Sequence, residues 1–264
     1  MSTFLEEVAA RSHKRVQADK QRTTVEQLRL WIKKKPPVNN FREAIHKQGQ
    51  VSLIAELKQA SPSAGLIRKE NDIPGRIKAY VEGGAGALSI LTEEEYFHGS
   101  PQFLEAARNE TKLPLLRKDF IVDSYQIEES RVLGADAILL IAAILPAGML
   151  YDFVQRTIDT QLTPLVEVHD ERDLERAINA HAKVIGVNNR DLKTLKVDMA
   201  TGDRLIPQIP KIGYTIVAES GIRTADDVRR YKKAGAHTIL VGESLMRQAD
   251  AVEAVRILVE AGKD

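Results

Sequence analysis

Eight short aliphatic runs, separated by amphipathic stretches, follow one another along this chain, and the alternation constrains its fold more than any other feature. Each intervening stretch places apolar residues at helical spacing over about a dozen residues, and several end in glycine, a common residue just after a helix. Such repetition is typical of strand–helix units that share a parallel sheet. The predicted strands span residues 51–57, 87–91, 114–118, 137–141, 163–168, 184–189, 215–220 and 238–242.

Eight strand–helix units predict a (β/α)8 TIM barrel, in the α/β class. The alternative is a doubly wound open sheet, but such sheets usually have about five or six strands. The length of 264 residues fits a barrel that forms one domain, because these folds routinely use about 200 to 250 residues. We therefore expect a single domain over residues 1–264, with an N-terminal helical extension over residues 1–47 and the barrel over residues 48–264.

The first 35 residues are polar, carry apolar side chains at helical spacing and predict two helices that end before Pro36 and Pro37. Residues 11–22 are basic, but Asp19 and the flanking glutamates dilute that charge. A solvated helix face is therefore favoured over a nucleic-acid contact.

The composition indicates a soluble globular protein. The chain has 38 Lys plus Arg, 37 Asp plus Glu and a net charge of +1, so no overall field attracts nucleic acid or an anionic membrane. With no cysteine it can form no disulfide, thiolate nucleophile or cysteine-bound zinc site. It has neither an apolar stretch of about 18 residues nor the apolar segment of a secretory signal. We expect a cytoplasmic monomer without a nucleic-acid or membrane partner.

Charged and amide side chains gather at the ends of the predicted strands. In a TIM barrel the active site lies at the carboxyl ends of the strands, above an interior packed with apolar side chains. A period of two places Glu56 and Lys58 on the same face of the first strand, and Lys118 ends the third, between Arg117 and Asp119. The candidates are Glu56, Lys58, Thr92, Glu93, Lys118, Asp119, Glu167, Asn188, Asn189, Arg190, Glu219, Ser220, Gly242 and Glu243.

A single lysine or glutamate at a strand end is more often a solvated loop charge or half of a structural ion pair. Here ionisable groups from several strands converge on one mouth, and this convergence favours chemistry. Buried charges need partners, and a ring of lysines and glutamates supplies them whether or not it is catalytic.

Small-residue turns follow the seventh and eighth predicted strands, in AESGIRTADD and LVGESLMR. In TIM barrels these two loops form the usual phosphate site, where backbone N–H groups face the anion. Gly221 and Gly242 allow close approach, and Ser61 in the loop after the first strand could add a hydroxyl. Purely structural turns also use glycine, but the position of both loops favours a phosphate site.

Sequence motifs for nucleotides and metals are missing. The chain has no G-x-x-x-x-G-K-[ST], no G-x-G-x-x-G after a strand and no H-E-x-x-H. Its six histidines are scattered, and none is paired at the spacing of metal ligands. We therefore expect acid–base chemistry without a metal.

Six segments together resemble the indole-3-glycerol phosphate synthase family of tryptophan biosynthesis. They lie in order between about residue 51 and residue 247 and read IAELKQASPSAG, LRKDFIVDSYQI, LVEVHDERDLERA, GVNNRDL, VAESGI and LVGESLMR. The combination is specific, although no single piece is. The N-terminal helical extension is also similar to that of the family. The departures, Leu57 and Gln59, touch no functional position.

The resemblance implies a carboxy-lyase that needs no cofactor. Its substrate would be 1-(2-carboxyphenylamino)-1-deoxyribulose 5-phosphate, and its products indole-3-glycerol phosphate, carbon dioxide and water. A carbon of the aniline ring attacks the ribulose carbonyl, so an acid must protonate the developing alkoxide. Loss of the carboxylate and then of water completes the indole, which takes at least one acid and one base.

The resemblance also implies roles for individual residues. Lys118 would be the general acid, and Glu167 the acid–base partner in dehydration. Glu56 and Asn188 would orient them and bind sugar hydroxyls, and Lys58 would pair with a substrate anion and share proton transfer. The implied substrate-binding residues are Ser61, Phe97, Phe120, Arg190, Leu192, Glu219, Ser220, Gly221, Gly242 and Glu243.

Within the binding set, Phe97 and Phe120 would wall an aromatic pocket, although a single Phe is more often core packing. Arg190 would meet the anthranilate carboxylate, and Glu219 a hydroxyl. Glu243 would offer its backbone N–H to phosphate, because its carboxylate would repel the anion.

Three other functions stay open. A barrel that isomerises a phosphoribosyl anthranilate would use an acid–base pair other than Lys118 and Glu167. A barrel that binds a phosphorylated ligand without turnover would tolerate the loss of either residue. Nucleic-acid binding through residues 11–22 is disfavoured by the near-zero net charge.

Overall fold

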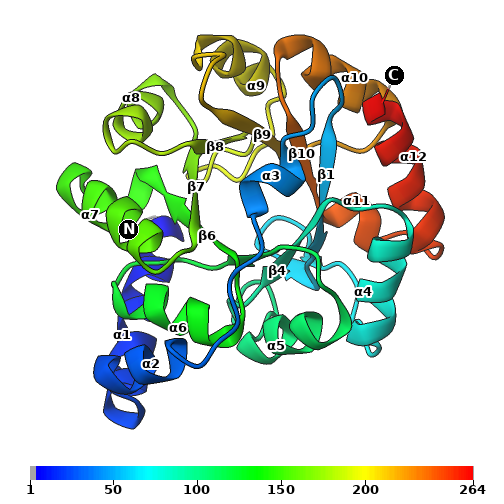
Figure 1. Ribbon diagram of the computed structural model, residues 1–264. Helices are drawn as coiled ribbons and strands as arrows, with labels where there is room; N and C mark the ends of the chain where they lie inside the picture. Colours follow the sequence, from blue (N-terminus) through cyan, green and yellow to red (C-terminus); the bar gives the residue numbers. More distant parts are fainter. Residues whose placement is uncertain (1–3, 264) are drawn as a thin grey trace.

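The computed structural model describes residues 4–263, and its centre is a closed barrel of eight parallel strands (Figure 1). Each strand pairs in parallel with both neighbours, so no edge is left open. The prediction of a TIM barrel is confirmed, and the open sheet is ruled out. The strands are β1 (Ser52–Leu57), β4 (Ala87–Leu91), β5 (Leu115–Lys118), β6 (Ala137–Ile141), β7 (Thr163–Val168), β8 (Val184–Asn188), β9 (Thr215–Glu219) and β10 (Thr238–Val241).

A helix follows each barrel strand and packs on the outside of the ring (Figure 1). Side chains of Ser100, Asp170 and Thr224 cap the helices that they precede, and Gly134 and Gly235 adopt left-handed backbone angles where helices end. The helices are α4 (Ile73–Glu82), α5 (Pro101–Glu110), α6 (Tyr125–Leu133), α7 (Ala147–Asp159), α8 (Glu171–Asn179), α9 (Ala200–Leu205), α10 (Ala225–Ala234) and α12 (Ala251–Lys263).

Short elements decorate the loops between these units. The loop after β1 forms a hairpin that the sequence did not predict. The elements are β2 (Ala60–Ser61), β3 (Gly65–Leu66), η1 (Ala142–Ile144), η2 (Ile206–Gln208) and α11 (Glu243–Met246).

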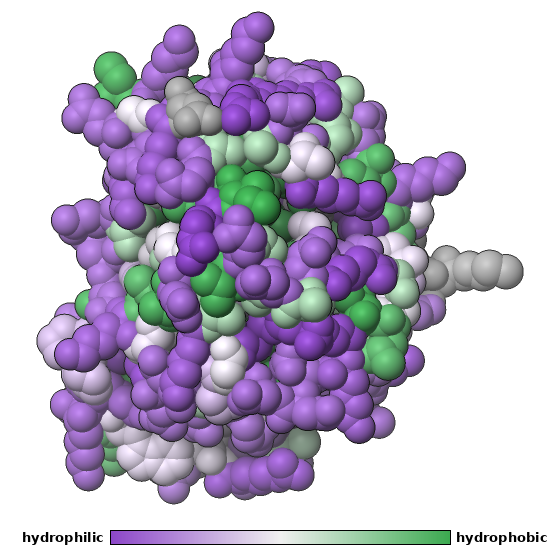
Figure 2. All heavy atoms as spheres, turned by 90° about the vertical axis from the view of Figure 1, so that its right-hand side faces the viewer, coloured by the Kyte–Doolittle hydropathy of each residue, from purple (hydrophilic) through white to green (hydrophobic). Residues whose placement is uncertain are grey.

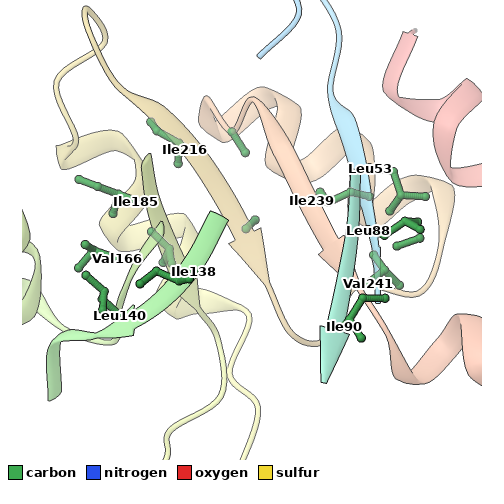
Figure 3. Close-up of a cluster of buried hydrophobic side chains, with 14 of the residues drawn as sticks. Leu53, Leu88, Ile90, Ile138, Leu140, Val166, Ile185, Ile216, Ile239 and Val241 are labelled. Atoms are coloured by element: carbon green, nitrogen blue, oxygen red, sulfur yellow. The ribbon is translucent and has the colours of Figure 1, made fainter. Parts of the chain in front are cut away.

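Alternate side chains of the strands enter two separate apolar layers. One layer fills the space between the strands and the surrounding helices, and Figure 3 shows Leu53, Leu88 and Ile138 among its members. The other fills the barrel interior and includes Ile54 and Leu165. The strands are thus buried on both faces, which is why they read as continuous aliphatic runs in the sequence.

The two helices predicted within residues 1–35 are confirmed, and the N-terminal extension has a third helix that was not predicted. Helices α1 (Phe4–Arg22) and α2 (Val25–Ile32) lie beside α6 (Figure 1). The chain then passes the start of β6, where the Asn39 backbone N–H donates to Asp136 Oδ1 at 2.7 Å.

The third helix, α3 (Phe41–Ile45), lies across the amino ends of the strands, near the centre of the ring in Figure 1. Phe41 and Ile45 are fully buried and join the interior layer. Arg42 donates to the Gly213 carbonyl at 2.7 Å and to Thr215 Oγ1 at 3.1 Å. The helix therefore closes the end of the barrel opposite the predicted site.

The surface over α4 and α12, seen in Figure 2, is mainly hydrophilic, with hydrophobic side chains scattered among charged ones. Within residues 4–263, none of the helices is long and apolar enough to span a membrane.

Candidate active site

One pocket at the carboxyl ends of the strands is lined by every residue that the sequence analysis assigned to catalysis or substrate binding. These residues come from the loops or ends of seven barrel strands, so the chain brings them together only when the barrel closes. They are Glu56, Lys58, Ser61, Phe97, Lys118, Phe120, Glu167, Asn188, Arg190, Leu192, Glu219, Ser220, Gly221, Gly242 and Glu243.

Lys118 lines this pocket and bridges two buried carboxylates. Its Nζ donates to Glu167 Oε2 at 2.8 Å and to Glu219 Oε2 at 3.1 Å. The lysine side chain is 14% exposed and each glutamate 2%, so the ammonium is the most accessible of the three groups, although all three line the pocket. The three groups come from β5, β7 and β9.

The two glutamates bridged by Lys118 differ in their proton affinity. Burial on its own raises the pKa of a carboxyl group, but Lys118 and His169 hold the pKa of Glu167 well below its usual range. For Glu219, burial and the nearby Glu167 outweigh Lys118 and raise the pKa to about 7. One carboxylate is therefore firmly ionised, while the other takes up a proton near neutral pH.

Burial alone would lower the pKa of Lys118, but Glu167, Glu219 and Glu56 outweigh it and raise the pKa. Lys118 is thus a fully protonated ammonium before any ligand arrives. A molecule that displaces a carboxylate from Nζ would weaken that stabilisation and release the proton more readily.

A second lysine–glutamate pair lies beside the first. Lys58 Nζ is 2.8 Å from Glu56 Oε1, which confirms that the two side chains share a face of β1. Ser89 donates to Glu56 Oε2 at 3.2 Å and so fixes the carboxylate. Asn188, at the end of β8, accepts a hydrogen bond from the Arg190 backbone N–H at 2.9 Å.

The three consecutive charges at residues 117–119 separate by strand alternation. Lys118 points into the mouth, while Arg117 is fully buried between β5 and α6, where it contacts Glu129 at 2.6 Å and Asp119 at 3.0 Å. Asp119 also accepts from Thr92 Oγ1 at 2.7 Å. Arg117 and Asp119 are thus structural, and they hold the end of β5 from which Lys118 projects.

One wall of the pocket is aromatic and apolar. The rings of Phe97 and Phe120 lie 6.2 Å apart, and Phe4 of α1 lies 6.3 Å from Phe120. Glu93 holds the loop of Phe97 by accepting from the backbone N–H groups of Tyr96 and Phe97, at 2.8 and 3.0 Å. This wall suits a flat apolar ring.

Strained turns form the opposite wall. Ser220 and Gly221 have φ angles of 66° and 83°, in the left-handed region. The Asn189 side chain holds this turn by donating to the Ser220 carbonyl at 2.9 Å. Ser244 Oγ donates to the Ile222 carbonyl at 3.2 Å and so ties the loop after β10 to the loop after β9.

Contacts fix two positions in the loop after β10. Glu243 Oε1 lies 3.0 Å from Arg247 Nη2, so its carboxylate is already paired. A Cβ at Gly242 would lie 2.4 Å from Glu56 Oε1, so only glycine leaves both this turn and Glu56 in place.

Arg190 spans the loops around the mouth. Its Nη1 donates to Ser63 Oγ at 2.8 Å and to the Leu195 carbonyl at 2.7 Å. Burial lowers the pKa of Arg190, and while Glu243 opposes this, Arg223 adds to it. Arg190 and Arg223 therefore repel each other across the pocket lining, and a bound anion would relieve that repulsion.

Several pocket residues were missed from the sequence. Phe4, Ser63 and Arg223 line the pocket. Ser63 and Arg223 lie in segments that the sequence analysis singled out but were given no role, and nothing in the local pattern marks Phe4. His169, beside Glu167, was dismissed as a scattered histidine, although the strand period of two puts it on the face of Glu167. Within residues 4–263, no group of three or more His, Cys, Asp or Glu side chains could hold a metal ion.

Comparison with known proteins assigns the family. The family model for indole-3-glycerol phosphate synthase matches residues 5–258. The chain belongs to this family. It is 43% identical over 253 residues to the indole-3-glycerol phosphate synthase of Desulforamulus reducens, covering 92% of this chain and 96% of the relative. To that of Azospirillum brasilense it is 47% identical over 226 residues, covering 84% and 86%.

Solved structures of distant sequence share the fold of this family member. The 3-hexulose-6-phosphate synthase of Salmonella typhimurium superposes with a TM-score of 0.64 at 12% identity, covering 80% of this chain and 98% of that one. Thiamine phosphate pyrophosphorylase of Pyrococcus furiosus gives 0.62 at 16% identity, covering 84% and 97%. These likenesses describe the barrel alone.

Proposed function

We propose that the chain converts 1-(2-carboxyphenylamino)-1-deoxyribulose 5-phosphate into indole-3-glycerol phosphate, carbon dioxide and water, with Lys118 as the general acid of ring closure. The single observation that carries the role of Lys118 is its bridge between Glu167 and Glu219 in the lining of the pocket. Family membership supports the overall reaction.

Substrate orientation follows from the two walls of the pocket. The carboxyphenyl ring packs against Phe97, Phe120 and Leu192, and the phosphate lies at the turns that contain Gly221 and Gly242. An anion at the phosphate end meets backbone N–H groups, the Ser61 and Ser220 hydroxyls, the Glu243 backbone N–H and the Arg223 guanidinium group. Arg190 reaches the carboxylate of the substrate.

Ring closure needs one proton. As the ring carbon bonds to the carbonyl carbon, the electron pair of the C=O bond moves to oxygen, and the Lys118 ammonium donates a proton to it. The carboxylate then leaves as carbon dioxide, and its bonding pair returns to the ring and restores aromaticity. No oxidant or reductant is required.

Dehydration needs both an acid and a base. Glu167, held as a carboxylate, removes a proton from the CH2 carbon next to nitrogen while the new hydroxyl leaves as water. The proton for the departing hydroxyl comes from Lys58, or from Lys118 after it has regained a proton from water. Glu56 and Asn188 orient these groups and bind the sugar hydroxyls, and Glu219 binds a hydroxyl.

We also propose that the chain is a cytoplasmic monomer and a single domain, in which the extension (residues 1–47) and the barrel (residues 48–264) work together. The part that Phe4 takes in the pocket wall supports this view, because it makes the extension a component of the site. Light scattering of the purified chain tests the monomer.

The direct test of the activity is turnover by the purified chain. We expect the indole absorbance to rise after addition of the substrate, with one carbon dioxide released per indole formed. N-(5-phosphoribosyl)anthranilate should not be consumed. Isomerisation of that compound, or tight binding of the carboxyphenylamino substrate without turnover, would favour the rival functions.

A further inference from the structure

Next to the pocket, but outside its lining, a histidine lies between two carboxylates. His169 Nε2 is 3.2 Å from Glu167 Oε1, and His169 Nδ1 is 3.5 Å from Asp173 Oδ2. The imidazole is 13% exposed, and both of its nitrogens are sealed from solvent without a hydrogen bond of ordinary geometry, so the two carboxylates lie at ion-pair distance. Asp173, at the start of α8, also accepts the His169 backbone N–H at 3.4 Å and so holds the loop in place.

This geometry requires a particular protonation state. A neutral imidazole has one nitrogen lone pair, and here that lone pair would face a carboxylate oxygen whichever nitrogen carried it. Only the doubly protonated ring offers an N–H to both carboxylates. Against the effect of burial, Asp173 and Glu167 raise the pKa of His169 to about 9.

The charged groups around His169 alternate in sign from helix α8 to the pocket. Arg176 Nη1 lies 3.5 Å from Asp173 Oδ1, and His169 separates Asp173 from Glu167. Glu167 in turn contacts Lys118 through its other oxygen. Each oxygen of Glu167 therefore faces a different cation, one inside the pocket and one behind it.

We propose that His169 is a positioning residue, whose imidazolium, held by Asp173, fixes Glu167 and keeps it ionised through the catalytic cycle. This inference rests on the proposed function. Of the two cations beside Glu167, Lys118 loses its charge during the reaction and His169 keeps it. When Lys118 gives its proton to the substrate, Glu167 loses one positive neighbour at the moment it must serve as a base. The imidazolium lies outside the pocket, and its charge remains.

The test replaces the imidazolium by a neutral side chain of similar reach. In His169→Asn we expect kcat to fall about tenfold, with KM changed less than about twofold, because a base that is freer and less often ionised is a poorer catalyst. The acid limb of the kcat profile, which reports the enzyme–substrate complex, should move up by about one pH unit. Asp173→Asn should shift it in the same direction by less.

Two readouts do not depend on turnover. Nitrogen-15 NMR should show both ring nitrogens of His169 protonated at pH 7.5 in the wild-type chain. Because the folded-state pKa is raised, the imidazolium stabilises the fold below about pH 6.5, and this stabilisation is lost as the pH rises through about 9. In His169→Asn the melting temperature should not show this decline as the pH rises through about 9.

A matched control is His13→Asn, since His13 is an exposed residue of α1. It should leave kcat, the pH profile and melting unchanged. A neutral His169 ring at pH 7.5, or an unmoved acid limb with normal kcat in His169→Asn, would overturn the proposal. If the wild-type chain shows no turnover while NMR finds the imidazolium, the proposed function fails and the ion-pair geometry stands.

Discussion

At the amino ends of the strands the barrel is closed by Phe41 and Ile45, which are fully buried, whereas at the carboxyl ends the buried side chains include Glu56, Glu167 and Glu219. Both ends belong to one barrel, and the side chains just named are buried at each. At the closed end His46 and His237 are stacked, with ring centroids 4.0 Å apart. At the open end, where the pocket lies, Lys58 is paired with Glu56, and Lys118 with Glu167.

The comparison of the two ends shows which buried groups stabilise the fold: the apolar side chains do so more than the ion pairs. Burying an aromatic ring favours folding by several kcal/mol, whereas a buried ion pair returns about as much as its desolvation costs. Glu219 illustrates this balance. Because its pKa is raised to about 7, stability declines as the pH rises from 4.5 toward 7. We infer that the closed end serves stability and the open end serves chemistry.

The largest effect that would sharpen this contrast is expected at the closed end. Phe41→Ala should lower the free energy of unfolding by about 3–5 kcal/mol, because it leaves a cavity in the interior layer. The kcat of the folded fraction should change less than about twofold. Denaturant unfolding and steady-state kinetics measure the two quantities.

Leu30→Ala provides the control for Phe41→Ala. Leu30 also belongs to the N-terminal extension, but its side chain is 57% exposed, so the loss should be below about 0.5 kcal/mol. If Phe41→Ala reduced kcat as strongly as it reduced stability, the two ends would not be separable.

A smaller effect is expected from Arg223, whose guanidinium group lies at the proposed phosphate site. Arg223→Gln should raise KM about tenfold and leave kcat within about twofold, because a phosphate contact stabilises ground and transition states alike. Inhibition by inorganic phosphate should be competitive in the wild type and weaken in parallel. Arg229→Gln, on the helix that follows, is the control. A loss confined to kcat would argue against a phosphate contact.

The smallest effect concerns the stacked histidines. Burial, followed by the neighbouring His46 and Arg42, lowers the pKa of His237 to about 4. The unfolded chain therefore takes up a proton that the folded chain resists, and stability is lost as the pH falls from 6.5 toward 4. Because His237 is half-buried, solvent screening limits the effect to about 1 kcal/mol.

His237→Asn tests the acid sensitivity. The Asn oxygen can still accept the Ile216 backbone N–H, which His237 Nδ1 accepts at 3.1 Å. We expect the drop in melting temperature between about pH 7 and pH 4.5 to shrink by about 2–4 °C. An unchanged pH dependence would show that the acid sensitivity lies elsewhere, in the carboxylates of the mouth.

The sequence predicted the barrel because strands buried on both faces read as aliphatic runs at regular intervals. Each of the eight runs is a strand, within about two residues at either end. Helix α3 was missed because it has five residues, too few for a periodic pattern. The path of the extension depends on contacts such as Asn39 with Asp136, which lie 97 residues apart and leave no local signal.

The candidate site was predictable where position alone decides it. Residues at strand ends meet in any TIM barrel, so Lys118 and Glu167 could be grouped before the structure was known. Their individual roles come from the family resemblance and stay predictions. His169 was missed because its partner, Asp173, comes from the following helix, and only the folded loop brings the two carboxylates to either side of the ring.

The most direct test of the central claim is the kcat of Lys118→Arg, measured with the melting temperature of the same sample. Arginine keeps the positive charge between Glu167 and Glu219 but cannot release a proton at neutral pH. We predict a melting temperature within a few degrees of wild type and a kcat at least about 10²-fold lower, because a positioned acid contributes about 10²- to 10⁴-fold. Lys118→Ala should be as slow. A stable Lys118→Arg chain with near-normal turnover would contradict the account and leave Lys118 as a structural ion pair.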